Sequence, residues 1–127
     1  MIDALFNQTN YVAVKKLLDA TALQHEAISS NISNVEMPGY KRLDLNPSFS
    51  TQLKQAIQSQ DSGQIGSLQP ELMVDANAVS PGRDGNTVNL EKEMLKMNNN
   101  TLSHAVETQL ITGQLLRLRL AITGRPT

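Results

Sequence analysis

The sequence predicts a mainly α-helical protein in which two long terminal helices form a coiled-coil-like pair, joined by an irregular middle segment. Apolar residues recur at alternating steps of four and three near both ends of the 127-residue chain, and this is the period of a coiled-coil seam. Only 3% of the residues are aromatic. Because two long stripes take most of the apolar residues, little is left for a compact interior, and we expect neighbouring subunits to supply part of the core.

The first long helix is predicted over residues 11–35, with Asn10 as its N-cap. The helix must end before Pro38, because proline disfavours helical geometry at the preceding residue. Pro38 and Gly39 suit the centre of a type II turn, since glycine permits positive φ. The side-chain amides of Asn31 and Asn34 can bond the free carbonyls of the last turn or the loop that follows. The stripe of this helix consists of Val14, Leu18, Thr21, His25, Ile28, Ile32 and Val35.

The middle segment, residues 43–88, is predicted to be irregular. A short amphipathic helix capped by Ser48 is indicated by the spacing of Phe49, Leu53, Ala56 and Ile57. Residues 58–69 are polar and contain Gly and Ser, a composition typical of a flexible loop.

A small β-hairpin is predicted near the end of this middle segment. Residues 71–74 can form its first strand, and Thr87 and Val88 can form the return strand. Residues 84–86, with the sequence Asp-Gly-Asn, are a tight-turn signal that would connect the two strands.

The last helix is indicated by agreeing signals at both of its ends. Asn89 is a good N-cap, and Glu91 and Glu93 in the first turn face the positive end of the helix dipole. Gly124 is expected to end the helix. The main stripe consists of Leu90, Met94, Met97, Thr101, His104, Thr108, Ile111, Leu115, Leu118 and Ile122. A second stripe of Leu95, Leu102, Val106, Leu110, Leu116 and Leu120 widens the face enough to contact more than one partner helix.

These patterns divide the chain into an N-terminal helix with its Pro-Gly turn (1–42), the irregular middle (43–88) and the C-terminal helix (89–127). We expect the two helices to form one assembly domain. The predicted subunit-interface residues are Val14, Leu18, Ile28, Ile32, Val35, Leu90, Met94, Met97, Ile111, Leu115, Leu118 and Ile122.

The residue content argues against an enzyme, a cofactor and a metal site. The chain has no cysteine, which excludes disulfides, thiolate metal ligands and a cysteine nucleophile. No nucleophile elbow and no glycine-rich phosphate loop occur. His25 and His104 fit no metal-ligand spacing, and both lie on the apolar stripes, where histidine more often packs at an interface or sets register.

The net charge of −1 is unevenly distributed. Residues 43–91 contain six acids and two bases, whereas residues 92–127 contain two acids and five bases. The two regions could pair head to tail between subunits, but solvated faces of opposite sign explain the distribution at least as well. No dense basic patch with aromatic residues predicts nucleic-acid binding. The sequence also shows no cleavable signal peptide and no apolar run near the roughly 20 residues of a membrane span.

Residues 30–41, SNISNVEMPGYK, resemble the signature of bacterial flagellar rod, hook and related axial proteins. The matching residues are Asn31, Ile32, Asn34, Pro38, Gly39, Tyr40 and Lys41. Ser30 and Ser33 replace the common alanines, and Met37 replaces the usual threonine, so a threonine hydroxyl bond in the turn is missing. Residues 84–94 and 109–122 narrow the resemblance to the proximal rod.

The resemblance implies a non-enzymatic structural subunit of the flagellar basal-body proximal rod. Such a subunit assembles through its terminal helices into the drive shaft that transmits torque from the membrane ring to the hook and filament. It is exported by the flagellar type III apparatus without a cleaved signal and resides in the periplasmic rod.

The implied partners are other copies of the chain, other flagellar rod proteins, the rod-base adaptor, the membrane ring and the export gate. Two other interpretations stay open. The chain could be another flagellar axial protein, such as the second proximal-rod protein, or a soluble helical adaptor or chaperone.

Overall fold

The computed structural model describes residues 8–124 of the chain. The first seven residues of the predicted N-terminal segment and the last three of the chain lie outside the described residues. The elements, in order, are α2 (Gln8–Ser33), β1 (Leu43–Leu45), α3 (Ser48–Gln58), α4 (Ser62–Ser67), β2 (Leu72–Val74) and α5 (Leu90–Thr123). The predicted fold class, mainly helical with long N- and C-terminal helices and short elements between them, is confirmed.

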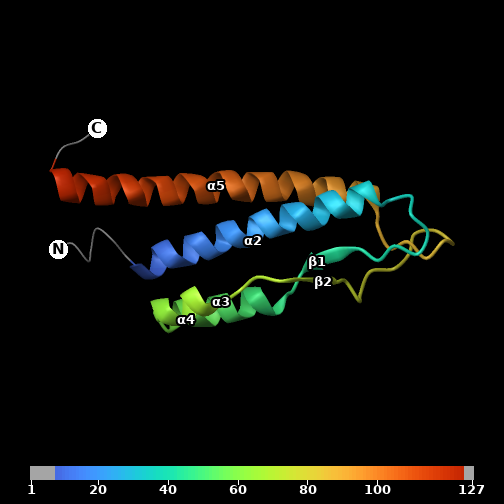
Figure 1. Ribbon diagram of the computed structural model, residues 1–127, viewed down its shortest axis with the longest axis horizontal. Coiled ribbons are helices and arrows are strands. Elements are labelled where there is room, and N and C mark those ends of the chain that lie inside the picture. Colours follow the sequence, from blue (N-terminus) through green and yellow to red (C-terminus); the bar gives the residue numbers. More distant parts are fainter. Residues whose placement is uncertain (1–7, 125–127) are drawn as a thin grey trace.

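The central element of the molecule is α2. The long helix α5 packs along one side of it, and the short helices and strands lie along the other (Figure 1). Hydrogen bonds join Asn31 to Glu93 and Thr21 to Glu107, so the two long helices run in opposite directions. The predicted pairing of the terminal helices is therefore present within one chain, as an antiparallel pair.

The bounds of α2 differ from the predicted range 11–35 at both ends. The helix begins at Gln8, so Asn10 lies inside the first turn and is not the N-cap. It ends at Ser33, two residues earlier than predicted. The backbone then forms a tighter turn, in which the N–H of Val35 donates to the carbonyl of Ile32, three residues earlier, at 3.3 Å.

The hydrophobic core lies between α2 and the two short helices. Its buried residues are Ala13 and Ala20 of α2, Phe49, Leu53 and Ala56 of α3, and Ile65 of α4. The two α2 alanines have small side chains, which let the short helices approach closely. Burying each large side chain contributes about 1.5–3 kcal/mol, so this core gives the chain a modest interior of its own.

The predicted flexible loop at residues 58–69 is wrong, because this stretch contains α4. The helix begins after Asp61, whose side chain accepts a hydrogen bond from the N–H of Gln64 at 3.1 Å. Ile65 is fully buried in the core and fixes the helix against α2. A helix of six residues with one apolar side chain is too short to show a helical repeat of apolar residues in the sequence.

Helix α3 confirms the predicted short helix, but its N-terminal cap differs. Ser48 is the first helical residue, and Pro47 occupies the N-cap position without a side-chain bond. The side chain of Asn46 instead accepts a hydrogen bond from the N–H of Ser48 at 3.0 Å.

The two strands form an antiparallel sheet, with Leu43 opposite Val74 and Leu45 opposite Leu72. The strand predicted at residues 71–74 is present, but its predicted partner is wrong. Thr87 and Val88 form no strand, and the N–H of Thr87 donates to the carbonyl of Tyr40 at 3.0 Å.

The predicted signals of α5 are confirmed at both ends. Asn89 Oδ1 accepts from the N–H of Lys92 at 3.2 Å, as an N-cap does. Gly124 has φ of 65°, and its N–H donates to the carbonyl of Leu120 at 2.7 Å. A left-handed glycine is the usual end of a helix.

Candidate functional site

The chain leaves α2 through the predicted type II turn. Gly39 has φ of 74°, and the N–H of Tyr40 donates to the carbonyl of Met37 at 3.2 Å. A bond between the first and fourth residues, with positive φ at the third, is the geometry of this turn. The N–H of Gly39 also donates to the carbonyl of Asp84 at 2.9 Å, so the turn is docked on the segment that precedes α5.

Asn86 closes the end of α2, a role that the sequence analysis missed. Its Nδ2 donates to the carbonyls of Asn34, Val35 and Met37 at 2.9, 3.0 and 2.7 Å. These carbonyls belong to the segment that follows Ser33, the last residue of α2, so Asn86 holds the exit from the helix in place. Asn86 is only 3% exposed, so these bonds are shielded from water. In the sequence this residue carries only the turn signal of residues 84–86.

Asn31, a residue of the family signature, extends the small sheet with its side chain. Its Nδ2 donates to the carbonyl of Leu43, and its Oδ1 accepts from the N–H of Leu43, both at 2.8 Å. Asn31 is fully buried. A side chain without an amide here would leave two backbone groups unpaired at a cost of about 1–3 kcal/mol each.

After α2 the chain turns back on itself through residues 37–43, and we call this segment the fold-back. The other polar residues of the signature hold it in place. The Tyr40 hydroxyl lies 3.0 Å from the Ser30 hydroxyl on the last turns of α2. Lys41 Nζ donates to the carbonyl of Gly85 at 2.8 Å, and Asn34 Nδ2 also lies 2.8 Å from the Ser30 carbonyl. The structure thus brings Asn31, Asn34, Gly39, Tyr40 and Lys41 of the predicted motif together. Pro38 is exposed at the turn and Ile32 is half-buried on α2.

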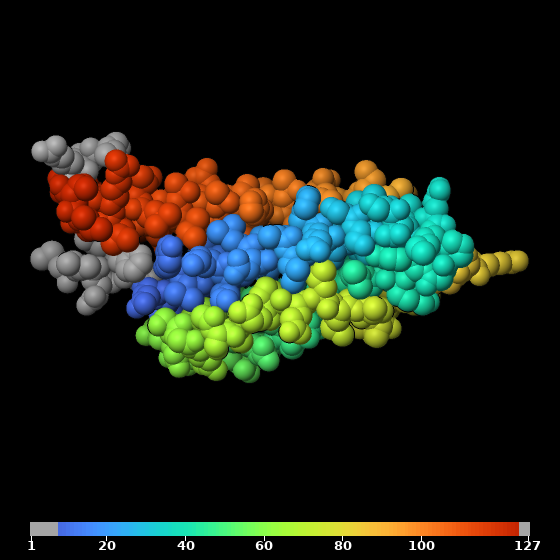
Figure 2. Space-filling view, viewed as in Figure 1, coloured from blue at the N-terminus to red at the C-terminus, as the bar shows by residue number. Residues whose placement is uncertain are grey.

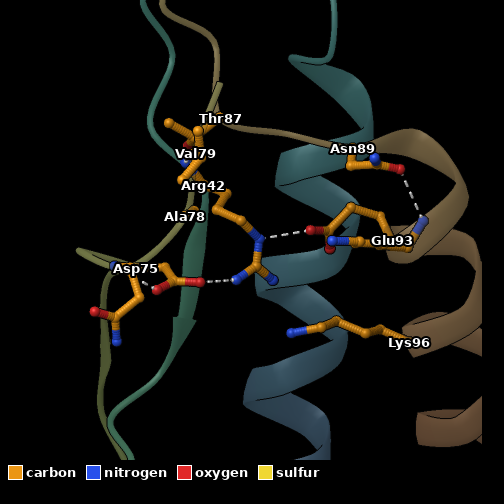
Figure 3. Close-up of a pocket in the computed structure, with 10 residues that line it drawn as sticks. Arg42, Asp75, Ala78, Val79, Thr87, Asn89, Glu93 and Lys96 are labelled. Atoms are coloured by element: carbon orange, nitrogen blue, oxygen red, sulfur yellow. Dashed lines mark hydrogen bonds and ion pairs between the residues drawn. The ribbon is translucent and has the colours of Figure 1, made fainter. Parts of the chain in front are cut away.

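A buried charge network lies beside this fold-back (Figure 3). Arg42 has a side chain that is 7% exposed, and its Nε lies 2.6 Å from Glu93 Oε1. Its Nη1 lies 2.9 Å from Asp44 Oδ2 and 2.5 Å from Asp75 Oδ2. Lys96 Nζ lies 2.8 Å from the same Asp44 oxygen. The network therefore ties β1 and the residue after β2 to the first turns of α5.

Burial and hydrogen bonding act in opposite directions on these groups. Burial alone would raise the pKa of Asp44, but hydrogen bonds from Lys96, Gln24 and Arg42 hold it well below its usual range. Burial alone would lower the pKa of Arg42, yet its bonds to Glu93 and Asp44 keep it above its ordinary value. Both groups are therefore charged at neutral pH.

A hollow of about 360 Å³ lies over this network and is lined mainly by polar residues, among them Arg42, Asp75, Lys92, Glu93 and Lys96. Its bases are largely balanced by the acids that they contact. The sequence analysis assigned Glu93 only to the helix dipole and did not identify Arg42. The sequence offers no local signal for either residue, because the network forms between segments that are distant in the chain.

Helix α5 exposes most of its large apolar side chains. We call this the α5 outer surface, and its residues are 42% to 75% exposed: Leu90, Met94, Leu95, Leu102, Val106, Leu110, Leu115, Leu116, Leu120 and Ile122. The helix forms one long side of the molecule (Figure 2). An exposed apolar surface that extends along a whole helix is typical of a protein interaction site.

The predicted interface residues are distributed between the inside and the outside of the chain. Val14 and Ile28 are buried within the chain, so no neighbour is needed to cover them. The half-buried residues are Leu18, Ile32, Val35, Met97, Ile111 and Leu118. Leu90, Met94, Leu115 and Ile122 are exposed on the α5 outer surface.

The two histidines lie near each other in the helix pair. His25 and His104 line a hollow of about 380 Å³ between α2 and α5, together with Thr21, Asn100 and Thr101. Over residues 8–124, no group of three His, Asp or Glu side chains is arranged to hold a metal ion. In the same part of the chain, no helix is both long and apolar enough to cross a membrane.

No protein-family profile matches the sequence, but several characterised proteins align with it over most of its length. The flagellar basal body rod protein FlgB of Aeromonas hydrophila is 29% identical over 117 residues, covering 84% of this chain and 87% of the relative. FlgB of Yersinia enterocolitica is 27% identical, covering 80% and 84%. FlgB of Salmonella typhimurium is 25% identical over 126 residues, covering 87% and 90%. The chain is a relative of the rod protein FlgB.

The signature residues that carry the resemblance all lie at the end of α2 and in the turn that follows it. Among them, Gly39 forms the type II turn, and Asn31 donates a hydrogen bond to the carbonyl of Leu43. Lys41 donates to the carbonyl of Gly85, in the segment before α5. Within this chain, the bonds of Asn31, Gly39 and Lys41 connect the end of α2 and its turn to β1 and to the segment before α5. The resemblance stated from residues 30–41 is confirmed by the alignments, which extend far beyond that segment.

Proposed function

We propose that the chain is a structural subunit of the flagellar proximal rod and that it assembles through the α5 outer surface. The similarity to FlgB supports the rod assignment. The observation that carries the assembly proposal is that α5 leaves ten large apolar side chains exposed along its length. No catalytic role is assigned, since the function requires binding surfaces and stiffness only.

The energetics favour docking against more than one neighbour. Completing the burial of a half-exposed Leu, Met or Val contributes on the order of 1 kcal/mol, half of the full-burial value. Covering all residues of the α5 outer surface would thus give about 10 kcal/mol. Association itself costs about 4–15 kcal/mol, so a partner that covers only a few of these side chains would bind weakly. A stable rod therefore needs most of the surface covered, from several subunits.

The fold-back and the charge network suit a shaft that transmits torque. They join α2, the sheet and α5 at one end of the molecule through bonds that are largely shielded from water. Closely packed protein has low compressibility and transmits strain. We propose that the two long helices act as one assembly domain, which carries torque from the membrane ring towards the hook and filament.

The proposed partners are other copies of the chain, other rod proteins, the rod-base adaptor, the membrane ring and the export gate. We further propose export through the flagellar type III apparatus without signal cleavage, followed by residence in the periplasmic rod. The α5 outer surface would be covered only after export, once neighbouring subunits are present.

The test is complementation of a deletion strain with Leu115→Asp. Leu115 is 46% exposed, so an aspartate is tolerated by the isolated chain, but it would place an unpaired charge in the proposed interface. We expect secretion to continue and flagella to be absent. Gln55→Asp is the matched control, since it adds the same charge to an exposed polar position of α3, away from the α5 outer surface.

Gln114 is not a suitable control, although it lies off the predicted stripe. Its Oε1 is buried and has no partner among the described residues. Normal swimming with Leu115→Asp, or equal loss with Gln55→Asp, would show that the interface has been assigned to the wrong surface.

A further inference from the structure

Glu107 is an acid buried between the two long helices, and it forms no ion pair among the described residues. It lies on the face of α5 that contacts α2 and is only 8% exposed. Its one hydrogen-bond partner among the described residues is Thr21, with 2.9 Å between Oε2 and the Thr21 hydroxyl. A buried carboxylate without a positive partner is costly, and such a group tends to become neutral instead.

The hydrogen count at Thr21 also favours a neutral acid. The Thr21 hydroxyl lies 3.0 Å from the carbonyl of Leu18 as well as 2.9 Å from Glu107. A hydroxyl has one hydrogen and two lone pairs, so it can donate to only one of these oxygens. If Glu107 is protonated, it donates to Thr21, and Thr21 donates to Leu18. Both contacts are then hydrogen bonds, whereas an ionised Glu107 would compete with Leu18 for the same hydrogen.

The neighbouring groups give Glu107 only partial compensation. Burial raises the pKa of the Glu107 carboxyl, and the bond from Thr21 and the charge of His104 oppose this effect. Helix α2 is the element packed against this part of α5. The titratable side chains lining the adjacent hollow are His25 from α2 and His104 from α5. Asn100 Nδ2 donates to the Thr21 carbonyl at 2.9 Å and fixes the position of Thr21.

We propose that Glu107 is a proton-linked latch: the protonated acid favours the closed pair of α2 and α5, and ionisation as the pH rises loosens this part of the pair. The sign follows from linkage. A carboxyl whose pKa is higher in the folded than in the unfolded chain stabilises the fold below its unfolded pKa. That contribution is lost as the pH rises through the folded value.

The test compares the wild-type chain with Glu107→Gln in urea unfolding between pH 4 and pH 8. A glutamine is neutral at every pH, and its amide can donate to Thr21 as the protonated acid does. We expect similar stability of the two proteins near pH 4. The ratio of their folding constants should then change in favour of the variant by up to about tenfold per pH unit, between the unfolded and folded pKa values. Glu26→Gln, at an exposed position of α2, is the control and should show no such trend.

A direct titration keeps the proposal testable if the variant fails to fold. The side-chain carboxyl carbon of Glu107 in the wild-type chain is followed by NMR as the pH is raised. A midpoint above the ordinary glutamate value of about 4.3 supports the latch. A midpoint at or below that value, or a Glu107→Gln protein whose stability follows the wild type at every pH, overturns it.

Discussion

At the scale of single residues, Gly39 is constrained by its backbone alone. Its φ is 74°, and a Cβ added there would meet no atom within 4 Å. We therefore expect Gly39→Ala to destabilise the fold by about 1–2 kcal/mol, because an L side chain disfavours this conformation. The urea midpoint of unfolding measures the effect.

Gly113 is the natural control for this substitution. It lies inside α5, and a Cβ there would also meet nothing within 4 Å. Because alanine is the better helix former, Gly113→Ala should stabilise the chain by roughly 0.5–1 kcal/mol. Stabilisation by both substitutions would mean that the turn at Gly39 is not held in positive φ in solution.

Asn86 carries a second prediction at this scale. Asn86→Ala removes the amide that binds the carbonyls of Asn34, Val35 and Met37. The Asn34 and Met37 carbonyls keep backbone N–H donors, so the Val35 carbonyl loses its one bond among the described residues. We expect a loss of about 1–3 kcal/mol, the cost of unpaired buried polar groups. Hydrogen exchange should also quicken in the last turn of α2. Asn99→Ala, at an exposed position of α5, should change stability by no more than about 0.5 kcal/mol.

At the scale of elements, the charge network predicts how the stability of the contact between β1 and α5 depends on pH. The pKa of Asp44 is lowered by Lys96, Gln24 and Arg42. Its contribution is therefore complete above its unfolded pKa of about 3.9 and is lost as the pH falls towards its folded value. Asp44→Asn should cost about 1.5–3 kcal/mol at pH 7, the range for hydrogen bonds to a charged group.

The difference between Asp44→Asn and the wild type should shrink below about pH 4, because Asp44 of the unfolded wild-type chain then takes up a proton while the folded chain still holds it ionised. The exposed Asp19 provides the control substitution, Asp19→Asn. A difference that stays constant from pH 7 to pH 2.5 would show that Asp44 acts through shape and not through its charge.

Elements whose signals are local could be predicted from the sequence. Helix α5 carries its own cap at Asn89 and its own terminator at Gly124, and both behave as expected. The type II turn is likewise specified by Pro38 and Gly39 alone. Helix α4 could not be predicted, because its place depends on one side chain, Ile65, meeting α2.

Contacts between distant segments account for the remaining differences. The partner of β2 lies about thirty residues upstream, with two helices between them, and no turn signal connects the two strands. Asn86 and Arg42 act on groups that are remote in sequence and become neighbours only after folding. The heptad pattern predicted which helices pair, but it did not show that buried acids, Glu93 and Glu107, would lie on the inner face of α5.

At the scale of the whole molecule, the two sides of α5 have different tasks. The inner side contacts α2 through several polar groups, and the α5 outer surface is apolar and uncovered. The chain is thus complete enough to bury a small core, yet it leaves most of its apolar helix surface for other subunits. This division is the central claim of the assembly proposal.

The most direct test uses the absence of cysteine from the natural chain. Leu110→Cys places one thiol on the α5 outer surface, where Leu110 is 51% exposed. A maleimide reagent is applied to the isolated protein and to purified basal bodies that contain the same variant, with a denatured sample as the reference for full labelling. We predict rapid labelling of the isolated protein and protection in the basal body. Equally rapid labelling in both would contradict the claim that this surface is buried when the rod assembles.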